Sequence, residues 1–163
     1  MKWEEIYDQT KYAFQNGEMS ELLAGKGNYH LPIYGAPISV PTDWTSVISK
    51  GIFKLYEDEQ DKRLVEVYEN TIRKLINGSS LEIWIAANII AYHLRCEVNK
   101  KATFEINKEM IDELSKAVHK NKNVLAADKS YQGKDNKYGL LDDILRLNNV
   151  LFRNCNIEII KDE

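Results

Sequence analysis

The chain has 163 residues, of which 44% are hydrophobic and 29% charged, and its net charge is −3 at pH 7. This length suits one compact unit, so we expect residues 1–163 to form a single domain. The acidic balance excludes a general attraction to nucleic acid, and no apolar run reaches the ~18 residues of a membrane span. The start of the chain lacks the apolar run of a signal peptide, and two cysteines are too few for a disulfide scaffold, so we expect a cytoplasmic protein.

The first third of the chain predicts two helices separated by a long loop. Apolar residues between Trp3 and Phe14 recur at helical spacing, and Asn16-Gly17 ends that helix. A short turn at 19–25 follows. Residues 24–41 are rich in Gly and Pro and have no helical period, so they predict one long loop. Thr42 and Asp43 then offer an N-cap to a second helix, which continues to Tyr56.

The stretch from 57 to 97 predicts an acidic turn followed by two helices. Residues 64–76 carry an apolar stripe opposite a polar face, which is typical of a surface helix. Ser79 and Glu82 have the spacing of a capping box, so they predict the start of the next helix, 79–97. That helix has two apolar stripes separated by two polar seams: Asn88 with Arg95, and Glu82 with His93 and Glu97. A helix with two apolar faces is packed on both sides.

The last third predicts an extended connector at 98–106, a helix at 107–122, a polar loop at 130–139 and a helix at 140–154. The tail from Cys155 onwards is expected to be a short strand or a disordered end. The fold class is therefore mainly α. We expect a layered helical bundle or a short HEAT-like α-solenoid, with the two-sided helix 79–97 at its centre and one long Gly/Pro loop at 24–41.

Two clusters are candidates for binding a partner protein. Tyr29, His30 and Tyr34 lie on the long loop, where exposed aromatic residues often make contacts. The alternative is that these aromatic residues fold back onto the helices as a lid on the core. The second set of candidates is the acidic run of Glu57, Asp58, Glu59 and Asp61. These carboxylates suit a basic partner surface, and the alternative is an ordinary solvated turn.

The polar seam with Glu82, His93 and Glu97 is the only candidate for chemistry. His93 and Glu97 are four residues apart and so can pair on one helix face, which is a structural interpretation. The functional alternative is a metal or acid–base site, but zinc needs three or four well-placed ligands. We find no phosphate loop, nucleophile elbow or cofactor motif, so we expect no cofactor, no metal and no catalytic residue.

A small, acidic, helical chain without catalytic motifs resembles the helical immunity proteins of bacterial polymorphic toxin and contact-dependent inhibition systems. Its helix "LEIWIAANIIAYHL", which follows "RKLINGSS", looks like the inner helix of a HEAT-like pair. The resemblance implies a stoichiometric inhibitor that binds a toxin domain, often a nuclease, and covers its active site. Two alternatives remain: a helical adaptor or scaffold protein, and a small hydrolase with a site assembled around Glu82, His93 and Glu97.

Overall fold

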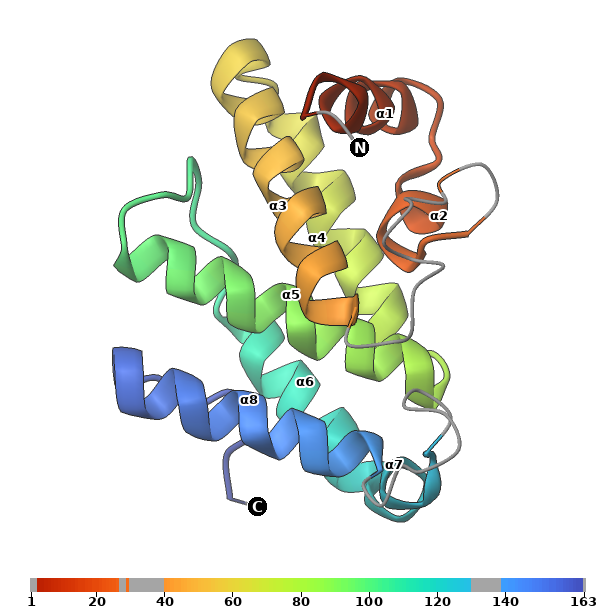
Figure 1. Ribbon diagram of the computed structural model, residues 1–163, viewed down its shortest axis with the longest axis vertical. Coiled ribbons are helices and arrows are strands. Elements are labelled where there is room, and N and C mark those ends of the chain that lie inside the picture. The colour runs from red at the N-terminus through yellow and green to blue at the C-terminus, as the bar shows by residue number, and fades with distance from the viewer. Residues whose placement is uncertain (1–2, 27–28, 30–39, 130–138, 163) are drawn as a thin grey trace.

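The computed structural model describes residues 3–26, 29, 40–129 and 139–162, and this part of the chain is mainly helical, as the sequence predicts. Within these ranges there are eight helices and no strand (Figure 1). The helices are α1 (Trp3–Gln15), α2 (Met19–Ala24), α3 (Val40–Glu59), α4 (Lys62–Ile76), α5 (Ser80–Val98), α6 (Glu109–Lys120), α7 (Lys122–Ala127) and α8 (Leu140–Cys155).

Helix α5 is the centre of a layered bundle. It packs against α3, α4, α6 and α8, and Figure 1 shows it between α3 and α8. Every residue from Ile83 to Ala91 is buried, including the polar Asn88. A run of nine buried residues is longer than two helical turns, so all sides of this stretch are covered. The prediction of a central two-sided helix is confirmed.

The long helix α3 carries α1 on the side away from the C-terminal helices. The two helices approach closely at Gly51, where an added Cβ atom would lie 2.7 Å from Oγ1 of Thr10. The Thr10 hydroxyl itself donates a hydrogen bond to the carbonyl of Ile6, so it is satisfied in this dry contact. A glycine is therefore required for the α1–α3 packing, which fixes the position of the acidic residues described below.

Five segments differ from the sequence-based expectations. Helix α3 begins at Val40, so Thr42 and Asp43 lie within the helix rather than at its N-cap, and the loop predicted at 24–41 is shorter at both ends, since Ala24 belongs to α2. Residues 19–24, predicted as a turn, form the short helix α2, which ends at Gly25 with φ of 66°. Glu57–Glu59 belong to the last turn of α3, so the predicted acidic turn is confined to Gln60 and Asp61. Residues 122–127 form α7, which the sequence analysis did not separate from the preceding helix. The tail is neither a strand nor unattached: Ile159 is fully buried, and Asn148 accepts its backbone N–H.

The start of α5 is fixed by the capping box that the sequence predicts. The hydroxyl of Ser79 accepts the backbone N–H of Glu82, and the Glu82 carboxylate accepts the backbone N–H of Ser79 at 3.0 Å. We expect Ser79→Ala to lower the free energy of unfolding by ~1 kcal/mol, because one N–H at the helix start loses its acceptor. Urea denaturation measures this loss. Ser80→Ala, one residue along, is the matched control and should change stability by much less.

Candidate functional site

The seam with Glu82, His93 and Glu97 does not form one site. Glu82 is engaged in the capping box at the start of α5. His93 follows 11 residues later, which is ~16 Å along the helix axis at 1.5 Å per residue. His93 and Glu97 do meet, with Nε2 and Oε2 3.3 Å apart, as the spacing of four residues predicts. The three-residue site that a hydrolase would need is therefore not assembled around these side chains.

His93 is fully buried in an aromatic cage. Its ring lies 4.9 Å from that of Phe53, 5.1 Å from that of Phe104 and 5.6 Å from that of Tyr68, centroid to centroid. The carbonyl oxygen of Phe104 only accepts, so Nε2 carries the proton and donates to it at 3.1 Å. Nδ1 then accepts from the Tyr68 hydroxyl at 2.9 Å. Both ring nitrogens are thus satisfied by the neutral form.

Burial lowers the pKa of His93 to about 4, although the Phe104 carbonyl and the Glu97 carboxylate oppose the shift. Glu97 in turn accepts the backbone N–H of Ile106 at 2.8 Å and the ammonium group of Lys108. Together the two side chains tie the connector between α5 and α6 to the central helix. The pairing of His93 with Glu97 agrees with the structural interpretation of the seam, whereas the burial of His93 and the attachment of the connector were not predicted.

Tyr29 is buried and packs onto the core, with 4% of its surface exposed. Its hydroxyl donates to Oε1 of Glu18, which comes just before α2. Burial is the main cause that raises the pKa of Tyr29, followed by this hydrogen bond, so the phenol keeps its proton. For this residue the structure shows the arrangement expected of a lid rather than of an exposed contact. The other two loop candidates, His30 and Tyr34, lie outside the described residues.

The acidic residues at the end of α3 are exposed, and each has a partner within the chain. Asp58 accepts the Tyr7 hydroxyl at 2.6 Å and the Lys54 ammonium at 3.1 Å, and these two bonds lower its pKa. Glu59 pairs with Lys11 at 3.2 Å, and Glu57 approaches Lys54 at 3.7 Å.

Asp61 has a local role at the start of α4. Its side chain accepts the backbone N–H of Arg63 as an N-cap and also pairs with the Arg63 guanidinium. Of the four acidic residues predicted to contact a partner, Asp58 and Asp61 therefore contribute to the fold of the chain. Glu57 and Glu59 are held only by exposed ion pairs, which are weak and readily exchanged.

The negative charge of the protein is concentrated in its N-terminal part. Residues 1–61 contain ten acidic and five basic residues, whereas residues 62–163 contain 15 acidic and 17 basic residues. On α1 the exposed acids are Glu4, Glu5 and Asp8, none of which has a partner among the described residues. Tyr12 lies on the same outer face, one turn after Asp8, and is 55% exposed. We call these four residues of α1, with Glu57–Glu59, the acidic face.

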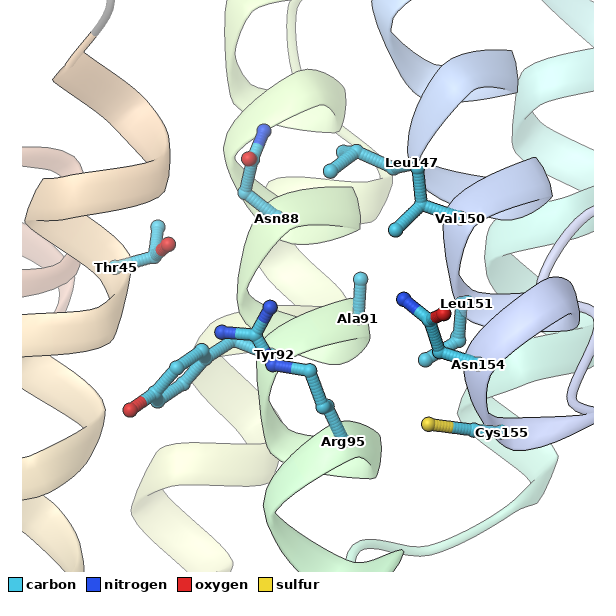
Figure 2. A pocket seen from close by; sticks show the side chains of 10 residues that line it. All are labelled: Thr45, Asn88, Ala91, Tyr92, Arg95, Leu147, Val150, Leu151, Asn154 and Cys155. Carbon is cyan, nitrogen blue, oxygen red and sulfur yellow. The ribbon is translucent and has the colours of Figure 1, made fainter.

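A groove runs along the outer side of α5, between α3 and α8 (Figure 2). Its floor is the other polar seam of α5, where Asn88 and Arg95 lie with Ala91 and Tyr92 between them. The wall on the α8 side consists of Leu147, Val150, Leu151, Asn154 and Cys155, and Thr45 of α3 stands opposite. The hollow within the groove has a volume of about 50 Å³.

The seam of Asn88 and Arg95, which the sequence predicts, forms the floor of this groove. The groove itself was not predicted, and its wall residues Leu147 and Val150 lie on the predicted helix 140–154. In the structure those two side chains are only half-buried, because they lie at the edge of the α5–α8 contact. The position of the neighbouring helix decides which edge of an apolar stripe stays exposed. A local sequence pattern does not show that position.

Within the described ranges, no three His, Cys, Asp or Glu side chains are grouped in a way that could hold a metal ion. The search for membrane spans, over the same residues, found no helix long and apolar enough to cross a bilayer. Compared with family models, with curated proteins and with solved structures, the chain shows no match.

Proposed function

We propose that this protein is a binding protein that neutralises a bacterial toxin domain by forming a stoichiometric complex with it. The observation that carries the proposal is the acidic face. A surface of one sign on one part of a small protein accelerates association with a partner of the opposite sign. Toxin domains that act on nucleic acids need a basic surface, and such a surface is complementary to this face.

The composition of the acidic face also suits a protein contact. Tyr12 is a large amphipathic side chain surrounded by carboxylates, and exposed tyrosines are enriched at the centres of protein interfaces. The scaffold beneath it is held in place, since α1 and α3 pack closely at Gly51 and the Tyr7 hydroxyl donates to Asp58 of α3. A preorganised surface loses little entropy on binding.

The two alternative functions, a hydrolase and a helical adaptor, require different features of the structure. A hydrolase built around Glu82, His93 and Glu97 is disfavoured, because Glu82 lies far from the buried His93. A helical adaptor would use the same kinds of surface as an inhibitor. An adaptor would bind its partner without abolishing the partner's activity, so the two functions differ in a measurable result.

The test uses the product of the neighbouring gene, which this proposal expects to contain a toxin domain. Cells that express the active toxin domain should survive when this protein is co-expressed, and the two purified proteins should form a complex of fixed stoichiometry. Addition of one equivalent should abolish the toxin's activity in vitro. Binding without loss of activity would identify an adaptor, and no binding together with no protection would refute the proposal.

Charge reversal on the acidic face should slow the association. We expect the double variant Glu5→Lys/Asp8→Lys to reduce the association rate constant about tenfold at low salt and to flatten its dependence on ionic strength, with little change in dissociation. Stopped-flow or biosensor kinetics measure both rates. The matched control is Glu66→Lys/Glu158→Lys, which changes the net charge equally at exposed positions outside the acidic face. Equal slowing by both doubles would mean that only net charge matters.

A further inference from the structure

We infer that the groove along α5 is a docking site for one helix of the partner protein, which places an apolar side chain in the hollow beside Ala91 and a carboxylate on Arg95. The inference rests on the proposed function, since the partner is the toxin domain. It assigns separate tasks to two surfaces. The acidic face attracts the partner, and the groove holds it.

The groove has the shape of a helix-binding site. Figure 2 shows α5 and α8 running side by side in the same direction, with Ala91 on the side of α5 next to α8 and the Tyr92 ring directed toward α3. On the other side of α5 stands α3, represented by Thr45. Leu81, Asn88 and Arg95 are each seven residues apart, so they lie along one face of α5. Asn88 and Ala91 are buried at the floor and Arg95 is exposed at one end, so a helix laid along the groove would contact its rim and Arg95.

The size of the hollow indicates a side chain as its occupant. About 50 Å³ corresponds to ~4 water molecules, which is far below the ~300 Å³ at which pockets for small ligands begin. Ala91 gives the floor its depth, because its side chain is a single methyl group. Leu147 and Val150 are half-buried apolar side chains on the wall. One aliphatic side chain of a partner fits this lining and would remove the remaining apolar surface from water.

Arg95 indicates that the partner helix in the groove carries a negative charge. Its guanidinium lies 5.1 Å from the centroid of the Tyr92 ring, and among the described residues no carboxylate is within ion-pair distance of it. The cation is thus positioned by the ring while its N–H donors remain available. A planar guanidinium held in this way is suited to binding a carboxylate through two parallel hydrogen bonds.

The distance between Ala91 and Arg95 indicates how the contact residues of the partner helix are spaced. Ala91 and Arg95 are four residues apart, which is one turn or ~6 Å along α5. A helix that lies along the groove meets both points with residues three or four apart in its own sequence. The expected binding element is therefore an amphipathic helix with an apolar residue and an acidic residue separated by one turn. Such a helix would differ from the basic surface that meets the acidic face.

The experiment measures binding of the neighbouring toxin domain, in a catalytically inactive form, to the full-length protein and its groove variants. Ala91→Leu fills the hollow, and Arg95→Glu reverses the charge at an exposed position that the fold does not need. We expect each to accelerate dissociation tenfold or more. Arg95→Lys should have a smaller effect, because lysine keeps the charge but not the fork of donors. The matched control, Lys74→Glu, makes the same change of charge at an exposed position on α4 and should leave dissociation unchanged.

The possible outcomes separate the two proposals. If the wild type binds and both groove variants dissociate at the wild-type rate, the docking site is wrong and the proposed function stands. If the wild type neither binds nor protects, the function fails and this inference with it. If sedimentation shows a wild-type dimer that Arg95→Glu and Ala91→Leu both convert to monomers, a second copy of the chain fills the groove and the inference is overturned. Circular dichroism melts confirm that each variant is folded.

Discussion

Replacing Trp84 with alanine is expected to lower the free energy of unfolding by about 3–5 kcal/mol, and Ile90→Ala by about 2–5 kcal/mol, the ranges for truncating large core side chains. Trp84 is 2% exposed and Ile90 is fully buried, both on the central helix. The indole Nε1–H of Trp84 also donates to Oδ2 of Asp143 at 2.7 Å, so the variant removes a link between α5 and α8 as well as apolar contacts. Urea melts at pH 7 measure the loss.

Two controls test the reason for this loss. Leu81 is on the same helix but is 40% exposed, so Leu81→Ala should cost less than ~1 kcal/mol. Trp84→Phe keeps most of the buried ring and loses the hydrogen bond, so it should fall between the wild type and the alanine variant. If Trp84→Ala and Ile90→Ala both cost less than 1 kcal/mol, α5 is not the centre of the bundle.

The position of α5 could be predicted because its signals are local. A capping box fixes its start at Ser79, and two apolar stripes show that it is covered on both sides. Both follow from residues within a few turns of one another, where helical geometry alone decides which side chains meet. The His93–Glu97 pair was predictable for the same reason. By contrast, α2 and α7 have six residues each, too few to show a helical period in the sequence.

The grouping of Glu82 with His93 was wrong for a geometrical reason. A helical wheel shows the angle of each residue around the axis but discards its distance along the axis, so residues 11 apart fall together. The burial of Tyr29 was undecidable for another reason. It depends on a hydrogen bond to Glu18 and on packing against α2, both set by how a loop returns to the core. Neither a helical period nor a turn motif in the sequence shows whether a loop packs back onto the core.

The wall of the groove shows the same limit. Leu147 and Val150 are half-buried on α8, and no local feature of the sequence indicates that they line a hollow with Thr45 of α3. A candidate site made of side chains from three helices follows from the relative placement of those helices. Only the Arg95 end of this site had a local signal, namely a charged residue within an otherwise apolar helix.

Acidification should destabilise the protein through His93. Its pKa is about 4 in the folded state, where burial opposes protonation, against an ordinary value of 6.5 in the unfolded chain. Above pH 6.5 the imidazole is neutral in both states, and its contribution to stability is fully present. As the pH falls below 6.5 the unfolded state takes up a proton that the folded state does not, so stability decreases until the pH reaches about 4. The lowering of the His93 pKa from 6.5 to about 4 corresponds to a loss of ~3 kcal/mol.

The charged groups around the ring act within the same window. Glu97 and the Phe104 carbonyl favour the protonated imidazole and Lys108 disfavours it, while the Tyr68 hydroxyl satisfies Nδ1 of the neutral ring. Protonation would force Nδ1 to carry a proton against the Tyr68 hydroxyl, and that hydroxyl would then have to turn from donor to acceptor. The bond from Nε2 to the Phe104 carbonyl would remain, so the interaction at risk is the one between α5 and Tyr68 of α4.

The variant His93→Gln isolates this contribution. Its amide can still donate to the Phe104 carbonyl but does not titrate, so we expect it to be less stable than the wild type at pH 7 and to lose less stability on acidification. The difference between the two proteins should shrink by ~3 kcal/mol between pH 7 and pH 4, as measured by urea melts along the pH series. In His119→Gln the His93 side chain remains, so the part of the stability loss below pH 6.5 that depends on His93 should remain. If an NMR titration of the folded protein places the pKa of His93 near 6.5, burial does not hold the ring neutral and this explanation fails.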